Sequence, residues 1–213
     1  MNTARAELRK LLTLPSLRLT ALLTCAANVL LSYAYVSAES RGDPLGPDPA
    51  LAPLGYTQAG FVVLGVLAAV SEYQAGGQIR STLLAMPRRL PLQAAKALTL
   101  AVVTLPVAAA VAATSTLPAG EPARMPTATV YLTLTTLLAA AVAGLVRRAE
   151  PAVVLLVTLY FIAGPMLRAR SDAVAAYLPD TAALDPSRGA AATILWTISA
   201  LVLAVLVFHR RDA

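Results

Sequence analysis

The sequence predicts an all-α integral membrane protein with six transmembrane helices, an amphipathic interfacial helix at the N-terminus and a short cytoplasmic helix between the second and third spans. The first observation is composition: of 213 residues, 58% are hydrophobic and 13% are charged, and the mean hydropathy is +0.70. Soluble domains carry about one quarter charged residues. The second observation is a series of long apolar runs, and the third is the placement of lysine and arginine between them.

Six apolar runs are long enough to cross a hydrocarbon layer about 30 Å thick, which takes roughly 20 helical residues. They are residues 19–38, 55–71, 97–117, 128–146, 152–167 and 190–208. None has Lys, Arg, Asp, Glu or His in its interior, and one such charge costs about 2.5–3.5 kcal/mol at the bilayer centre. We therefore interpret residues 1–213 as a single transmembrane domain.

The start of the fourth run alternates polar and apolar side chains from Thr127 to Thr133, as a β-strand would. Inside a bilayer, however, every backbone N–H and C=O needs a partner within the spanning segment. We therefore expect a helix here too.

The distribution of basic residues predicts the orientation of the spans, because cytoplasmic loops are enriched in Lys and Arg. With the N-terminus inside, the inner segments hold twelve basic residues and the outer loops hold five. The inner ones are Arg5, Arg9, Lys10, Arg18, Arg80, Arg88, Arg89, Lys96, Arg147, Arg148, Arg210 and Arg211. The outer ones are Arg41, Arg124, Arg168, Arg170 and Arg188. We therefore expect both termini in the cytoplasm.

Residues 1–18 are predicted to form an amphipathic cytoplasmic segment. Apolar side chains recur at helical spacing on one side and charged side chains occupy the other. The two sets are Ala4, Leu8, Leu11 and Leu12 against Arg5, Glu7, Arg9 and Lys10. Such a segment can lie flat on the lipid of the inner leaflet. A simple charged anchor explains the pattern equally well.

The sequence lacks the motifs of several protein classes. The phosphate-binding loop needs Gly-Lys-Ser/Thr, whereas the two lysines, Lys10 and Lys96, are followed by Leu and Ala. A single histidine, His209, and a single cysteine, Cys25, leave no intramembrane Ser/His pair, no disulfide and no thiol-rich metal site. We expect no enzyme activity and no cofactor in this chain. We also expect no nucleic-acid partner, because the basic residues form no stripe on a soluble face.

The apolar runs also lack the ionisable groups that ion-driven carriers place within their spans. A transporter of this composition would take its energy from a separate partner chain. The polar residues inside the first span are uncharged and recur every four positions, and they include Thr24, Asn28 and Ser32. This stripe is a candidate translocation path. Hydrogen bonding to neighbouring helices explains it as well, and both interpretations stay open.

The segment between the second and third spans, residues 72–96, is too polar to cross the membrane. From position 71 it reads SEYQAGGQIRSTLLAMPRR, and AAK follows at 94–96. Gly76 and Gly77 break the helix that leaves the membrane, and Pro87 ends a short helix over residues 78–86. The segment resembles the inner loop of bacterial permeases of the ABC-type-two exporter family. The layout is similar too, with an N-terminal amphipathic piece, six spans and a longer last outer loop at residues 168–189.

The resemblance implies a permease subunit of an ABC transporter in the bacterial cytoplasmic (inner) membrane. Its expected partners are a second copy or a homologous permease, and ATP-binding subunits that hold ATP and Mg. In this family the inner loop forms a coupling helix that docks on the ATP-binding subunit. The resemblance implies that the following residues of this chain dock on the ATP-binding subunit: Glu72, Tyr73, Ile79, Arg80, Leu83, Arg88 and Arg89.

The function expected from the resemblance is export of a hydrophobic or amphipathic compound, such as a drug, an antibiotic peptide or a lipid-like molecule. The alternative, from a different class, is a non-transporting membrane anchor or assembly subunit of a membrane complex. A neighbouring gene for an ATPase would favour the exporter.

Overall fold

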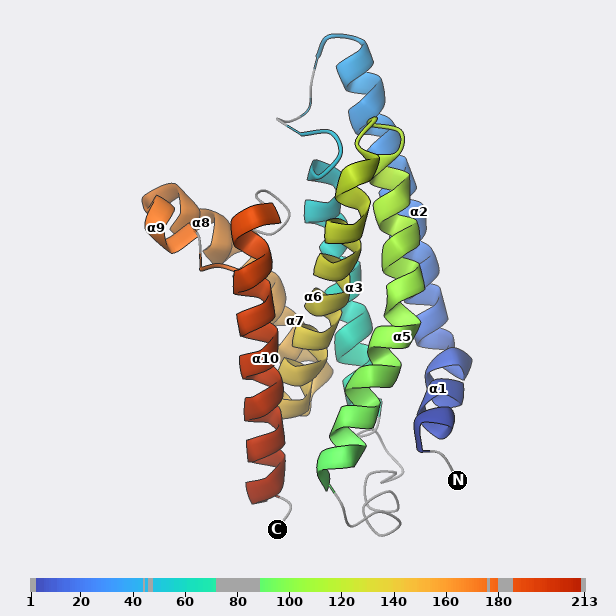
Figure 1. The fold of residues 1–213 in the computed structure, drawn as a ribbon, viewed down its shortest axis with the longest axis vertical. Helices are drawn as coiled ribbons and strands as arrows, with labels where there is room; N and C mark the ends of the chain where they lie inside the picture. The colour runs from blue at the N-terminus through green and yellow to red at the C-terminus, as the bar shows by residue number, and fades with distance from the viewer. Residues whose placement is uncertain are drawn as a thin grey trace.

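A computed structural model describes residues 3–43, 45, 48–71, 89–175, 177–179 and 186–211, and within these ranges the chain is helical, with no strands (Figure 1). The long helices lie side by side as a bundle. They are α2 (Pro15–Ser40), α3 (Ala52–Val70), α5 (Arg89–Thr116), α6 (Met125–Val146) and α10 (Pro186–Arg211). The N- and C-termini lie at the same end of the bundle, which we call the terminal end.

Five helical stretches are long and apolar enough to cross a membrane. They are Pro15–Ser40, Ala52–Val70, Leu92–Thr116, Pro122–Val146 and Ala149–Arg170. The apolar helix Ala191–Val207 within α10 is shorter. The prediction of an all-helical, multi-pass membrane protein is confirmed for the described residues, and the count of six spans stays a prediction. The alternating Thr127–Thr133 stretch lies within α6, as expected for a lipid environment.

Large apolar side chains lie on the outside of the bundle as well as in its core, and the core also holds uncharged polar side chains. Fully or nearly fully buried side chains include Asn28, Ser115 and Thr135. Exposed ones include Leu22, Leu30 and Leu195. Isolated exposed apolar residues are normal in soluble proteins, but continuous apolar faces are not. An apolar exterior around a partly polar interior is the arrangement expected when the solvent is lipid.

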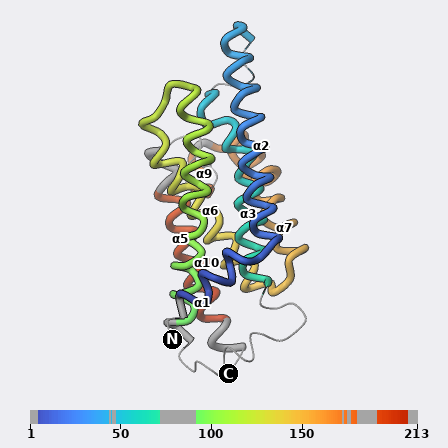
Figure 2. The backbone as a smooth tube through the Cα atoms, turned by 90° about the vertical axis from the view of Figure 1, so that its right-hand side faces the viewer, coloured from blue at the N-terminus to red at the C-terminus, as the bar shows by residue number. Residues whose placement is uncertain are grey.

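Helix α1 (Thr3–Thr13) runs across the terminal end of the bundle rather than along the axis of α2 (Figures 1 and 2). The break falls at Leu14, whose backbone is extended (φ −68°, ψ 117°). Pro15 then occupies the first turn of α2, where its missing N–H would have had no partner in any case. Leu11 packs α1 into the core that α2, α3 and α5 share. A helix is therefore present within residues 1–18, and its place at a cytoplasmic membrane interface stays a prediction.

Helix α5 begins at Arg89, inside the segment 72–96 that we predicted to be a loop. Residues 89–96 form its first turns. Pro91 is tolerated there because the first N–H groups of a helix have no intrahelical acceptor. Helix α5 thus begins earlier than the apolar run suggests.

The fifth predicted span contains a change of helix type. Helix α7 (Ala149–Thr158) continues through a π-helical turn, η2 (Leu159–Ala163), into α8 (Gly164–Arg170), and α9 (Asp172–Ala175) follows. Pro165 has no N–H to offer the carbonyl of Phe161, and the wider π turn lies directly before it. Figure 1 shows α8 and α9 turned outward from the axis of α7.

Ionic contacts join two loops at the opposite end of the bundle. Arg124, in the short 3₁₀ turn η1 (Pro122–Arg124), forms an ion pair with Asp48, and its Nε lies 3.4 Å from Glu121 Oε2. The other oxygen of Asp48 accepts the backbone N–H groups of Ala50 and Leu51 at 3.0 and 3.2 Å. The same carboxylate therefore holds the turn that precedes α3 against the α5–α6 connection.

Helices α3 and α6 meet through small residues. A Cβ atom at Gly65 would lie 2.2 Å from the backbone oxygen of Thr136 and 2.9 Å from Cβ of Ala139. No real Cβ approaches so closely, so this contact requires glycine. Small residues allow close backbone approach, which drives helix association in lipid through van der Waals packing.

We expect Gly65→Ala to destabilise the folded bundle by about 1–3 kcal/mol, because the added methyl group forces α3 and α6 apart. The measurement is equilibrium unfolding of the purified protein in mixed micelles. Gly55→Ala is the matched control, since Gly55 is also in α3 and a Cβ there would have no neighbour within 4 Å. Equal stability of the two variants would contradict this account of the interface.

Candidate functional site

The three residues predicted as a translocation path lie on the buried face of α2. Thr24, Asn28 and Ser32 are 6%, 0% and 2% exposed. Their side chains face α3 and α5 rather than lipid. The spacing of four residues therefore does place them on one side of the helix, at one interface.

The Asn28 side chain joins three helices. Its Nδ2, which carries two hydrogens, has three acceptors within 3.0 Å: the carbonyl of Val111 at 3.0 Å and the hydroxyls of Thr114 and Ser115 at 2.8 and 2.9 Å. Its Oδ1 accepts from Thr57 and Ser115, both at 3.1 Å. We call the group of side chains made by Asn28, Ser32, Thr57, Thr114 and Ser115 the Asn28 junction.

The Asn28 junction has no unpartnered polar atom among its described side chains. An unpaired amide in an apolar medium costs several kcal/mol, so each hydroxyl here compensates for burial of another polar group. Hydrogen bonds between helices explain the polar stripe of α2 without a passage. The role of these residues in translocation stays a prediction.

Thr24 makes a different contact. Its hydroxyl donates to the carbonyl of Thr20 at 2.7 Å within α2. A Cβ atom at Gly60 would lie only 2.0 Å from the Thr24 hydroxyl oxygen. Thr24 therefore packs directly against the backbone of α3.

Sequence reasoning missed the partners of Asn28. Thr57, Thr114 and Ser115 lie in the second and third apolar runs, and their only signal was a hydroxyl within an otherwise apolar stretch. A further buried bond, from the Tyr131 hydroxyl to Gln58 Oε1, joins α6 to α3. It was not predicted either.

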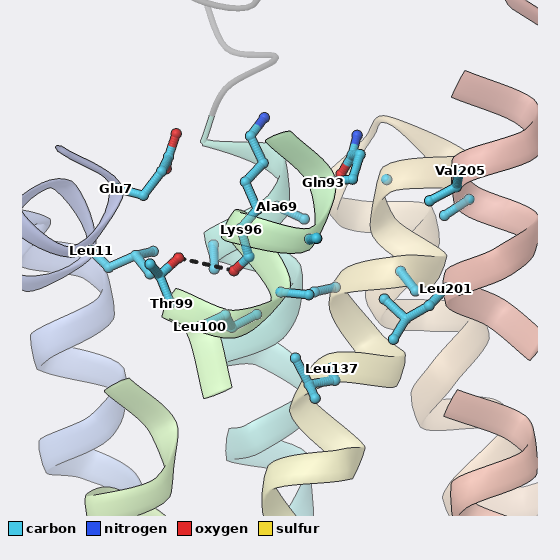
Figure 3. A pocket seen from close by; sticks show the side chains of 17 residues that line it. Glu7, Leu11, Ala69, Gln93, Lys96, Thr99, Leu100, Leu137, Leu201 and Val205 are labelled. Carbon is cyan, nitrogen blue, oxygen red and sulfur yellow. Dashed lines mark hydrogen bonds between the residues drawn. The ribbon is translucent and has the colours of Figure 1, made fainter. Parts of the chain in front are cut away.

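A cavity of about 510 Å³ lies at the terminal end, between α1, α3, α5, α6 and α10 (Figure 3). We call it the terminal cavity. Much of its wall is apolar, and this part includes Ala69, Leu100, Leu137, Gly144, Leu201 and Val205. Its polar lining includes Glu7, Gln93 and Lys96, whose side-chain ends point to the same side in Figure 3, away from Leu137 and Leu201.

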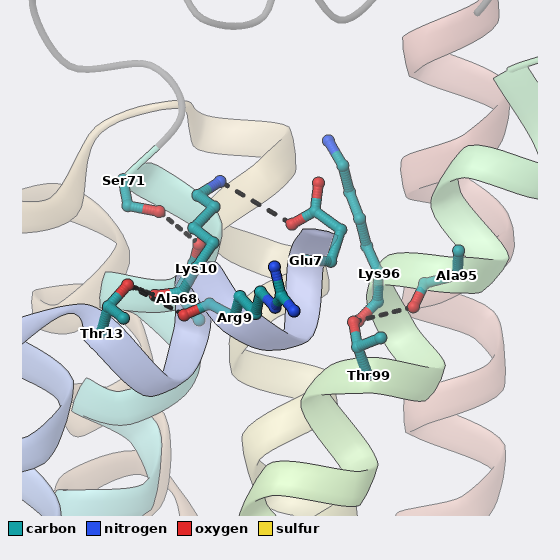
Figure 4. A network of polar contacts seen from close by, with 9 residues as sticks. All are labelled: Glu7, Arg9, Lys10, Thr13, Ala68, Ser71, Ala95, Lys96 and Thr99. Atoms are coloured by element: carbon teal, nitrogen blue, oxygen red, sulfur yellow. Dashed lines mark hydrogen bonds and ion pairs between the residues drawn. The ribbon is translucent and has the colours of Figure 1, made fainter. Parts of the chain in front are cut away.

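The polar side of the terminal cavity carries charges of both signs. Lys10 Nζ lies 3.8 Å from Glu7 Oε2, and Figure 4 shows the Lys96 side chain extended beside Glu7. The hydroxyl of Thr99, another lining residue, donates to the carbonyls of Ala95 and Lys96 at 2.8 and 3.0 Å. The sequence pattern of residues 1–18 placed Glu7 on a charged face but gave no sign of a cavity.

The residues predicted to dock an ATP-binding subunit fall almost entirely outside the described chain. Glu72, Tyr73, Ile79, Arg80, Leu83 and Arg88 lie outside it. Arg89 is the first residue of α5, and only its backbone is described. Among the described residues no group of three or more His, Cys, Asp or Glu side chains could hold a metal ion.

Comparison with known proteins adds no assignment. No family model, no curated protein and no solved structure matches the chain.

We expect Asn28→Ala to lower the stability of the bundle by about 1–3 kcal/mol, because hydrogen bonds between membrane helices are worth about 0.6 kcal/mol on average and the hydroxyls of Thr57 and Ser115 lose their amide partner. Thermal unfolding in detergent measures the effect. Thr20→Ala is the matched control on the same helix, since the Thr20 hydroxyl donates to Ser16 within α2. A stable Asn28→Ala protein with altered substrate preference would instead place Asn28 in a passage.

Proposed function

We propose that this chain is the membrane-spanning permease subunit of an ATP-driven ABC exporter in the bacterial inner membrane. Its cargo is a hydrophobic or amphipathic compound. ATP and Mg bind a separate ATP-binding subunit, and a second permease copy or a homologous permease completes the assembly. The proposal rests on the resemblance of residues 71–96 to the inner loop of such permeases and on where that segment enters the bundle.

The observation that carries the proposal is the direct continuation of this segment into α3 and α5. Helix α3 ends at Val70, with Ser71 as its C-cap, and α5 begins at Arg89. Both helix ends lie at the terminal end of the bundle (Figures 1 and 2). The two helix ends that border residues 72–88 in the sequence therefore lie on the same side of the bundle.

Helices α3 and α5 are placed so that a movement of residues 72–88 would be transmitted to the other helices of the bundle. Helix α3 contacts α2, α5, α6 and α7, and its Thr57 reaches α5 through the Asn28 junction. Coupling between two sites needs a physical element that both share. A push on residues 72–88 by an ATP-binding subunit would act on two helices that are hydrogen-bonded to a third.

The placement of the termini supports the rest of the proposal. If α10 is a sixth span, an even number of crossings leaves both chain ends on one side, and both ends do lie at the terminal end. Helix α1 then lies at the cytoplasmic interface, and a coupling helix in residues 72–88 lies on the same side. The charge-free runs match a cargo that needs no intramembrane counter-charge.

We expect cysteines at Ala6 and Tyr177 to label from opposite sides of the membrane in a Cys25→Ser background. Ala6 is exposed on α1, and Tyr177, near the outward-turned α9, is 75% exposed. An impermeant maleimide added to spheroplasts should modify Tyr177→Cys, and Ala6→Cys only after permeabilisation. The background protein shows the labelling due to other groups. Modification of Ala6→Cys in sealed spheroplasts would reverse the proposed orientation.

Charge reversal in the proposed coupling helix should uncouple transport from ATP hydrolysis. We expect Glu72→Arg and Arg80→Glu to insert and assemble normally but to abolish transport, because an ion-paired docking surface becomes repulsive. The assays are copurification of the ATP-binding subunit and substrate-stimulated ATP hydrolysis in proteoliposomes. Arg41→Glu, at the end of α2 away from this segment, is the control and should behave as the parent. Normal transport by both coupling variants would favour a membrane anchor or assembly subunit.

A further inference from the structure

The terminal cavity owes its space to small side chains on facing helices. Ala69 of α3, Ala140 and Gly144 of α6, and Ala204 of α10 all line it. A Cβ atom at Gly144 would meet no atom within 4 Å. Protein interiors are close-packed, and voids larger than a water molecule are few. A hole of about 510 Å³ lies instead within the usual range of ligand sites, about 300–1,000 Å³.

The polarity of the residues that line the cavity changes along its depth. Leu137 and Leu201 line the end toward the middle of the bundle, and the ends of Glu7, Gln93 and Lys96 lie together on the other side (Figure 3). Lys96 directly precedes the charge-free run that begins at Ala97. A ligand that fits this wall has an apolar chain and a polar head at the level where the bundle leaves the hydrocarbon.

The charges beside the cavity favour an anionic head. Lys10 lies 3.8 Å from Glu7 and offsets its charge, and Lys96 adds a further positive charge. Arg5 and Arg9 are exposed on α1 nearby. Among the described side chains on this side of the cavity, basic groups therefore outnumber the carboxylate of Glu7, as in basic segments that attract anionic lipid.

We propose that the terminal cavity binds an acyl chain with an anionic head group, the chain lying against Leu137, Gly144 and Leu201 and the head beside Lys96. Burial of the chain is favourable because an empty cavity gives its lining atoms no contact partners on one side. The site is separate from the Asn28 junction. It exists whether or not the chain is a permease, and its test needs no ATP-binding subunit.

The test is photolabelling of the purified full-length chain in nanodiscs of zwitterionic phosphatidylcholine. The probe is palmitic acid that carries a diazirine in the middle of its chain, and the labelled positions are mapped by mass spectrometry. We expect labels at residues 137–144 and 201–205, with most of the signal lost when excess palmitate is added. Labels spread over exposed residues such as Leu22 and Leu30, without competition by palmitate, would overturn the proposal.

One pair of variants separates cavity binding from contact with bulk lipid. Gly144→Leu fills the cavity and should lose the labels, whereas Gly55→Leu adds the same side chain elsewhere and should keep them. Where Gly144→Leu does not fold, Gly144→Ala should give a partial loss. Unchanged labelling of a folded Gly144→Leu protein would contradict the proposal.

The head-group preference is tested with Lys96→Gln and, as its control, with Arg41→Gln, which removes an exposed positive charge at the opposite end of the bundle. We expect Lys96→Gln to weaken competition by palmitate about tenfold, a change of about 1.4 kcal/mol, because the head group loses a charged hydrogen-bond partner. Hexadecanol, which has no charge, should compete weakly with the parent protein. Equal competition by hexadecanol and palmitate would remove the anionic head from the proposal. A phosphatidylglycerol with the same photoreactive chain identifies the source: labelling by it points to a membrane lipid, and labelling by the free acid alone to a soluble amphiphile.

Discussion

Hydrocarbon offers no hydrogen-bonding partner, and this constraint governs how the helices of this protein are arranged. Asn28 has the largest demand of any side chain inside the first span, and it is met by α3 and α5 together. Several threonine hydroxyls meet the same demand locally: Thr104, Thr116 and Thr136 each donate to a carbonyl four residues earlier. The first kind of bond fixes which helices are neighbours, and the second kind only allows a polar group to be present.

Small residues have two opposite effects on the packing of this bundle. At Gly60 and Gly65 they bring α2 and α6 into backbone contact with α3. At Gly144 and Ala204 they leave the terminal cavity open. The residue types are the same, and the difference is set by how far apart the helices lie at each level. Close approach supplies packing energy, whereas separation leaves a volume that only another molecule can fill.

The two features are connected through α3 and α5. Both helices enter the Asn28 junction, and both line the terminal cavity through Ala69 and Lys96. The same two helices border the segment that resembles a coupling loop. A bound acyl chain and a docked ATP-binding subunit would therefore act on one pair of helices, which ties the two proposals to a common structural element without making either depend on the other.

The sequence by itself determined the class of fold. Charge-free apolar runs of membrane length imply helices because no other single segment satisfies its own backbone, and this held even for Thr127–Thr133, whose alternation favours a strand. The apolar runs also located most helices to within a few residues. The early start of α5 at Arg89 escaped this reasoning because residues 89–96 are more polar than the apolar run that follows. The π turn before Pro165 escaped it because the type of helix does not change hydropathy.

Tertiary structure alone decided which residues meet. The partners of Asn28 lie 29 and 87 positions away, and no local pattern points to them. In a soluble helix, polarity marks the outer face, but here lipid-facing Leu22 and core Leu132 are equally apolar. The polar stripe of α2 marked its buried face, but the neighbours of that face are invisible in hydropathy. The terminal cavity, which five helices form together, follows only from their packing.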